Sequence, residues 1–150
     1  MVVSKIYPIA SVPSRPIWNI FTLLIYMLSE PLNLFRSNLP SRVKVELNKG
    51  GLVISRGVYG REVPSELIIK EGIKTVNLNI EREYQPIIKT SGVELPFYKE
   101  GWFRLRNGER ALVYLTDLTK TVYIPTKNGY SIILSINERE KFLRLLKKLA

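Results

Sequence analysis

The chain has 150 residues, of which 45% are hydrophobic, so it is long enough and apolar enough to bury a core of its own. Its 23 lysine and arginine residues outnumber its 13 aspartate and glutamate residues, and the net charge of +10 favours negatively charged partners. Histidine and cysteine are absent, which excludes disulfide bonds, thiolate chemistry, serine–histidine–aspartate triads and imidazole metal sites.

The first forty residues differ in character from the rest. Three prolines, Pro8, Pro13 and Pro16, favour extended or irregular chain at the N-terminus. A dense apolar run, IWNIFTLLIYML, follows at residues 17–28, and Pro16 suits the start of a helix there. We therefore expect an N-terminal extension over 1–40 that contains an apolar helical segment at 17–28.

Three interpretations of this apolar run stay open. It forms a helix packed on the domain, a segment in contact with a membrane surface, or a short or remnant span. Twelve helical residues reach only about 18 Å, against about 30 Å of hydrocarbon in a bilayer, so we prefer the packed helix. The side chains that would make the apolar contact are Trp18, Phe21, Leu24, Ile25 and Leu28.

From residue 41 onward the pattern becomes that of β-strands. Val43, Val45 and Leu47 alternate with charged residues, as in a half-buried strand, and a turn follows at 48–51. Further strands are expected at 52–56, 58–63 and 73–80, and a long connection at 84–100 with room for a short strand at 87–90.

The last third of the chain carries the clearest structural signals. Strands at 102–106 and 111–115 flank Asn107-Gly108, which is a strong hairpin signal. Strands at 121–124 and 130–134 flank a second turn that contains Pro125 and Gly129. These spacings predict two consecutive β-hairpins.

A C-terminal helix is predicted to follow. Asn137 and Glu140 have the spacing of a capping box. The residues at helical spacing that would form one apolar stripe are Phe142, Leu145, Leu146 and Leu149. We expect this stripe to close the open end of a barrel, with lysine and arginine residues on the outer face.

About seven short antiparallel strands followed by one helix are typical of the pleckstrin-homology-like small barrel. Residues 43–149, about seven-tenths of the chain, resemble the prokaryotic pleckstrin-homology-like families of archaea and bacteria, whose function is uncharacterised. The matching residues are GWFRL at 101–105, Gly108, ALVY at 111–114, VYIPT at 122–126, GYSIILS at 129–135 and FL at 142–143, together with Val63, Pro64 and Leu67. The resemblance implies a mainly β domain over 41–150 with a capping helix, a domain that this family commonly places after transmembrane segments.

Inositide recognition is not implied by this resemblance. Members of the wider fold that bind phosphoinositides use basic residues around the first hairpin. Lys49 and Arg56 occupy that region here, but the position of the closing basic residue holds Val58. Loose attraction to anionic lipid remains, without a stereospecific pocket.

The sequence also contains no phosphate-binding glycine loop of either common type. Glu81 and Glu83 would share one strand face, where solvated carboxylates are the simpler interpretation than an acid–base pair. We therefore expect no catalytic residues, no metal ligands and no cofactor. The prevalence of lysine, arginine and glutamate among the charged residues is typical of proteins from thermophiles.

Most of the positive charge falls in the last fifty residues. Residues 101–150 carry ten basic and four acidic residues, which is +6 of the total of +10. In an extended strand, Trp102, Arg104 and Arg106 share one face, and Phe103 and Leu105 share the other, which we expect to be the core face. The candidate surface for an anionic partner comprises Trp102, Arg104, Arg106, Lys141, Arg144, Lys147 and Lys148. The competing interpretation is that Trp102 packs at the barrel edge and the arginines are solvated.

These observations lead to one preferred function and two alternatives. The preferred function is a non-enzymatic interaction module whose partner is an anionic lipid surface or a protein. We expect it to be cytoplasmic and peripheral to, or anchored in, the inner face of a membrane. The alternatives are a soluble nucleic-acid-binding protein and a scaffold that self-associates into a homo-oligomer.

Overall fold

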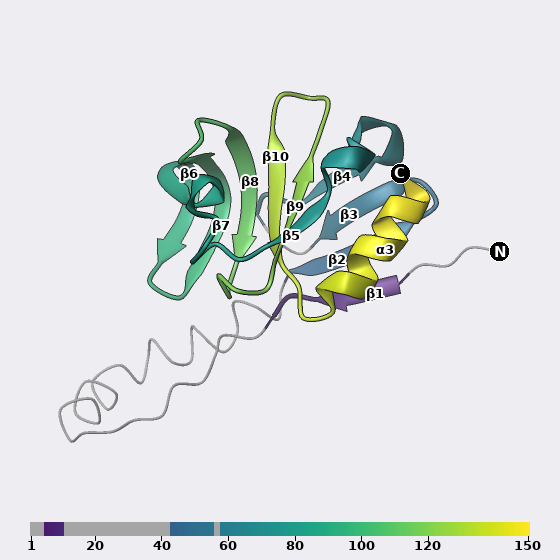
Figure 1. Ribbon diagram of the computed structural model, residues 1–150, viewed down its shortest axis with the longest axis horizontal. Helices are drawn as coiled ribbons and strands as arrows, with labels where there is room; N and C mark the ends of the chain where they lie inside the picture. Colours follow the sequence, from purple (N-terminus) through teal and green to yellow (C-terminus); the bar gives the residue numbers. More distant parts are fainter. Residues whose placement is uncertain (1–4, 11–42, 56–57) are drawn as a thin grey trace, which may run out of the picture.

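Two β-sheets and a C-terminal helix make up the part of the chain that the computed structural model describes, which is residues 5–10, 43–55 and 58–150 (Figure 1). The first sheet has the order β1-β2-β3-β4 and the second the order β5-β9-β10-β8-β7-β6. The strands of the first sheet are β1 (Lys5–Pro8), β2 (Lys44–Asn48), β3 (Gly51–Ser55) and β4 (Arg61–Pro64). The strands of the second are β5 (Lys74–Val76), β6 (Pro86–Leu95), β7 (Tyr98–Leu105), β8 (Arg110–Leu115), β9 (Thr121–Pro125) and β10 (Ser131–Ser135). The remaining elements are the 3-10 turns η1 (Ser65–Leu67), η2 (Lys70–Gly72) and η3 (Arg82–Tyr84), and the helix α3 (Arg139–Leu149).

The first sheet is an antiparallel meander whose inner face is apolar. Val45 lies opposite Tyr7 on one side and Ile54 on the other, and all three are buried. This is the alternation that residues 43–47 predict. The sheet starts earlier in the chain than the expected domain start at residue 41, because β1 supplies its first strand.

Residues 5–10 are held at several points. After β1, Ile9 forms an isolated bridge with Ile136, and the amide of Ala10 donates to the carbonyl of Ser135 at 3.0 Å. The Thr116 hydroxyl donates to the carbonyl of Ala10. This segment therefore belongs to the folded unit. The apolar run at 17–28, for which a helix is predicted, lies outside the described residues.

The second sheet contains one parallel pair, which the hairpin pattern does not predict. The β9–β10 hairpin forms as expected, but β10 inserts between β9 and β8 and runs parallel to β8. The β8–β9 connection crosses the end of β10, where Ser135 Oγ accepts from the amides of Thr116 and Asp117. The prediction of about seven strands, all antiparallel and closed into a barrel, is corrected here: the described residues form ten strands in two sheets that do not close.

The expected long connection at 84–100 is largely a strand. Residues 86–95 form β6, which pairs antiparallel with β7. Pro86 stands at the first position of the strand, where a missing amide is tolerated. Gly92 lies opposite Gly101, and a Cβ on Gly92 would lie only 2.1 Å from the carbonyl oxygen of Glu100. Pro86 and Gly92, residue types that favour a loop, here mark the start of the strand and a close backbone approach. The strand expected at 73–80 is shorter, because only Lys74–Val76 pairs.

The predicted C-terminal helix is confirmed, although its predicted cap is wrong. The helix begins at Arg139, and Glu138 occupies the N-cap position without a side-chain hydrogen bond. Phe142 and Leu146 are fully buried, and the Phe142 ring packs edge-on against Tyr7 with 5.1 Å between centroids. The helix contacts β2, β3, β5 and β9, and it lies across the first sheet in Figure 1.

The second sheet is covered on both faces. One face shares a core with the first sheet and α3, and includes Trp102, Leu112 and Ile132. The other face carries a second core, which includes Phe103 and Val113. Leu78 and Tyr84, from the segment between β5 and β6, pack into this second core. Burial on both faces explains why β8, β9 and β10 are nearly continuous apolar runs.

Candidate anion-binding surfaces

Trp102 lies in the core between the two sheets. Only 9% of its surface is exposed, and its ring packs edge-on against Tyr130 with 5.1 Å between centroids. Phe103 and Leu105 are buried on the opposite face, as their alternation predicts. The indole therefore offers little surface on which a base or a ligand ring could stack.

Two arginines that the sequence did not single out flank this indole. The guanidinium carbon of Arg110, on β8, lies 4.1 Å from the centroid of Trp102. The guanidinium carbon of Arg61, on β4, lies 5.1 Å from the same centroid and 5.7 Å from that of Tyr130. Such contacts are favourable because the negative face of the ring attracts a cation.

Arg104 belongs to the same group. It lies on β7 directly opposite Arg110, and its Nη1 donates to the carbonyl of Gly108 at 2.8 Å. We call Arg61, Arg104 and Arg110 the arginine cluster. Arg106 is separate from it, because it follows β7 and binds Gln85 through its amide and, at 3.3 Å, through Nη2.

Glu109, the acidic neighbour of Arg110, is engaged on the opposite face of the sheet. Its Oε2 accepts hydrogen bonds from Tyr123 at 2.7 Å and from Ser131 at 2.5 Å. Burial, together with the hydrogen bond to Glu109, raises the pKa of Tyr123 to about 12, against the opposing effect of Ser131. Within the part of the chain that the structure describes, this carboxylate forms no ion pair with the arginines.

Glu100 is the acidic residue on the same face as Trp102. It is buried, and it accepts from the amide of Val58 at 3.1 Å and from the hydroxyl of Tyr98 at 2.6 Å. Burial and this hydrogen bond raise the pKa of Tyr98. Burial also raises the pKa of Tyr114, and the charge of Arg61 opposes that shift. Both tyrosines therefore stay protonated, and both carboxylate oxygens of Glu100 have partners.

A second group of cations lies on α3. Lys141, Arg144 and Lys148 are exposed and Lys147 is half-buried, on the side away from Phe142 and Leu146. The Nζ atom of Lys141 lies 4.0 Å from Oε2 of Glu138. Lys5 on β1 adjoins Lys141, and this neighbour lowers the pKa of Lys5. We call Lys5, Lys141, Arg144, Lys147 and Lys148 the basic strip.

The structure divides the predicted surface into two. The arginine cluster lies on β4, β7 and β8, whereas α3 packs on β2, β3, β5 and β9. In Figure 1, β7 and α3 lie on opposite sides of the molecule. No local sequence pattern identifies Arg61, because its partner Trp102 lies forty-one positions farther along the chain, in the other sheet. Arg110 could have been found from its register opposite Arg104.

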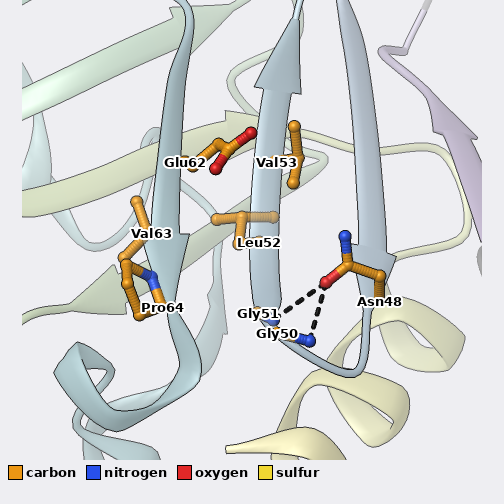
Figure 2. Close-up of a pocket in the computed structure, with 8 residues that line it drawn as sticks. All are labelled: Asn48, Gly50, Gly51, Leu52, Val53, Glu62, Val63 and Pro64. Atoms are coloured by element: carbon orange, nitrogen blue, oxygen red, sulfur yellow. Dashed lines mark hydrogen bonds between the residues drawn. The ribbon is translucent and has the colours of Figure 1, made fainter.

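A shallow pocket of about 210 Å³ lies at the β2–β3 turn beside β4 (Figure 2). The side chain of Asn48 accepts hydrogen bonds from the amides of Gly50 and Gly51, which closes the turn. Gly51 has a φ of 137°, and a Cβ there would lie 2.2 Å from the carbonyl oxygen of Val63. The lining residues include no cation and one carboxylate, that of Glu62, so this pocket has the character of a tight turn rather than of an anion site.

Among the residues that the structure describes, no helix has the length and apolar character needed to cross a bilayer. A family model described as a bacterial PH domain matches residues 43–150. The chain belongs to this family. No curated protein and no solved structure matches it. The family match confirms the resemblance to prokaryotic pleckstrin-homology-like domains that the sequence shows. PH domains are in general non-catalytic interaction modules that bind lipids or proteins.

Proposed function

We propose that this bacterial PH domain is a non-enzymatic module that docks on an anionic membrane surface through the basic strip. The observation that carries the proposal is the exposure of Lys141, Arg144 and Lys148 with few ion pairs. Among the described residues, the only ion pair of the strip is the exposed contact of Lys141 with Glu138 at 4.0 Å. An exposed pair at that distance is weak, so Lys141 can exchange it for a contact with an external anion.

The fold fixes the direction in which the strip faces. Phe142 and Leu146 are buried against the first sheet, so the cations of α3 lie on the outward side of the helix. Lys147 and Lys148 also stand in the last turn, where they complement the helix dipole. Each lysine or arginine close to an anionic bilayer contributes about 1 kcal/mol of binding.

The apolar run at 17–28 supplies a second contact in this proposal. Pro8 pairs with Lys44, so the chain leaves the first sheet after Pro8 and re-enters it at Lys44 at the same end of the sheet. The sequence between these points carries the apolar run together with Arg15, Arg36 and Arg42. An apolar contact combined with a basic surface is the pair of signals that gives stable peripheral binding.

Vesicle co-sedimentation of the full chain tests this function. We expect binding to vesicles that contain phosphatidylglycerol, weaker binding to phosphatidylcholine alone, and loss of the difference at high salt. Replacing residues 17–28 by a glycine–serine linker keeps β1 in place and should weaken binding to both kinds of vesicle. Equal recovery with neutral and anionic vesicles would contradict the proposal. Binding of nucleic acid, or self-association in place of lipid binding, would favour one of the alternatives expected from the sequence.

A further inference from the structure

We infer that the arginine cluster binds a phosphate group, at a site distinct from the basic strip. The three arginines come from β4, β7 and β8, which belong to two different sheets. The guanidinium carbons of Arg61 and Arg110 both lie close to the Trp102 centroid, so they are no farther apart than the sum of those two distances, about 9 Å. The fold therefore brings the two cations to one place on the surface.

The donors of this cluster are largely unused within the protein. Among the described residues, the side chains of Arg61 and Arg110 make ring contacts but donate no hydrogen bond, and the side chain of Arg104 donates one to Gly108. All three side chains are exposed at their own positions. Their remaining N–H groups are thus available to an external acceptor.

The arrangement is unfavourable in the absence of an anion. Arg104 and Arg110 lie directly opposite each other on paired strands, and like charges in that relation destabilise a sheet. Among the described residues, neither Glu109 nor Glu100 forms an ion pair with these arginines: Glu109 binds Tyr123 and Ser131 on the other face, and Glu100 is held by Val58 and Tyr98. Glu62, beside Arg61, lines the pocket at the β2–β3 turn (Figure 2).

The chemistry of the cluster favours phosphate over other anions. Guanidinium groups present planar donors that match carboxylate and phosphate oxygens in pairs, and a phosphomonoester, with close to two negative charges, carries more charge than a carboxylate. Contact with Trp102 and Tyr130 restrains Arg61, which lowers the entropic cost of ordering it on a ligand. Because the indole itself is buried, it cannot stack a base, so a nucleic acid would gain only its phosphate contacts here.

The test is a titration of the full chain with inorganic phosphate. Binding is monitored through the NMR signals of the arginine Nε–H groups and of the Trp102 indole N–H. We expect saturable chemical-shift changes for the arginines of the cluster. The apparent Kd for phosphate should rise about tenfold or more in the double variant Arg61→Gln/Arg110→Gln. The matched control is Arg82→Gln, which removes an exposed arginine outside the cluster and should leave the Kd unchanged. Arg104→Gln serves as a second variant, because within the described part of the chain the Arg104 side chain donates its one hydrogen bond to a turn carbonyl and has no ring contact with Trp102, so its loss should weaken binding without disturbing the indole.

The source of the phosphate group is distinguished by vesicles of equal charge. Preferential binding to phosphatidic acid over phosphatidylglycerol, lost in Arg104→Gln, would assign the site to a lipid headgroup. Saturable binding of inorganic phosphate without that preference would assign it to a soluble phosphate compound. Absence of saturable shifts, or the same Kd in Arg104→Gln and Arg82→Gln, would overturn the inference. Variants of the basic strip should leave the phosphate titration unchanged, so this test is independent of the proposed membrane function.

Discussion

At the scale of single residues, neighbouring positions on one strand serve different cores. Trp102 packs between the two sheets, whereas Phe103 packs on the far face of the second sheet. A sheet buried on both faces leaves few positions for charge, so several of its polar groups bind each other, although the buried Tyr114 hydroxyl has no hydrogen-bond partner among the described residues. The group formed by Glu109, Tyr123 and Ser131 is the clearest case, since the carboxylate accepts from both hydroxyls.

This group predicts how stability depends on alkaline pH. Burial, with the hydrogen bond to Glu109, raises the pKa of Tyr123 to about 12, above the unfolded value of about 10. The protonated form is favoured by folding, so its contribution is complete below pH 10 and is lost as the pH rises through 12. Urea unfolding between pH 9 and pH 12 should show the wild type losing about 2 kcal/mol more than Tyr123→Phe.

The comparison with Tyr123→Phe isolates this residue. Tyr98 and Tyr114 also have raised pKa values, and they contribute to alkaline unfolding in both proteins. Parallel loss of stability in the wild type and Tyr123→Phe across this pH range would show that the Tyr123 hydroxyl is not held as the structure describes.

At the scale of elements, α3 holds its place through two side chains. Phe142 and Leu146 are fully buried, whereas Leu145 and Leu149 of the predicted stripe are only partly buried. The helix covers the inner face of the first sheet, so the helix and the sheet depend on each other for burial.

Replacing Leu146 by Ala tests this packing. We expect a loss of about 2–5 kcal/mol in the free energy of unfolding, because the change removes buried methyl groups and leaves a cavity. Leu145→Ala is the matched control and should cost less, since that side chain is partly exposed. Both values come from urea denaturation. An equal loss of unfolding free energy in the two variants, or a loss near zero for Leu146→Ala, would contradict the burial of Leu146 between the helix and the first sheet.

At the scale of the whole molecule, the sequence predicts strand positions better than strand partners. The period-2 alternation of 43–47, the hairpin signal at Asn107-Gly108 and the apolar stripe of the last helix all correspond to observed elements. Pairing direction leaves no such local signal, so the parallel β8–β10 pair and the open pair of sheets were not predicted. The same limit applies to the candidate site, because Arg61 and Trp102 meet only through the packing of two sheets.

The exposed cations are the feature of the whole molecule on which the proposed function rests. Because the basic strip and the arginine cluster lie on separate elements, variants of one leave the other intact. Three positions of the strip, Arg144, Lys147 and Lys148, can be neutralised without touching the buried Phe142 or Leu146. Three exposed cations elsewhere, Lys70, Arg82 and Lys89, provide a control of equal charge change.

The most direct measurement is the affinity of these two triple glutamine variants for vesicles that contain phosphatidylglycerol. We predict that neutralising Arg144, Lys147 and Lys148 weakens binding by up to about 100-fold, from about 1 kcal/mol for each cation at an anionic surface. The control variant should lose much less, since its cations lie outside the strip. Equal affinities for the two variants would contradict docking through α3.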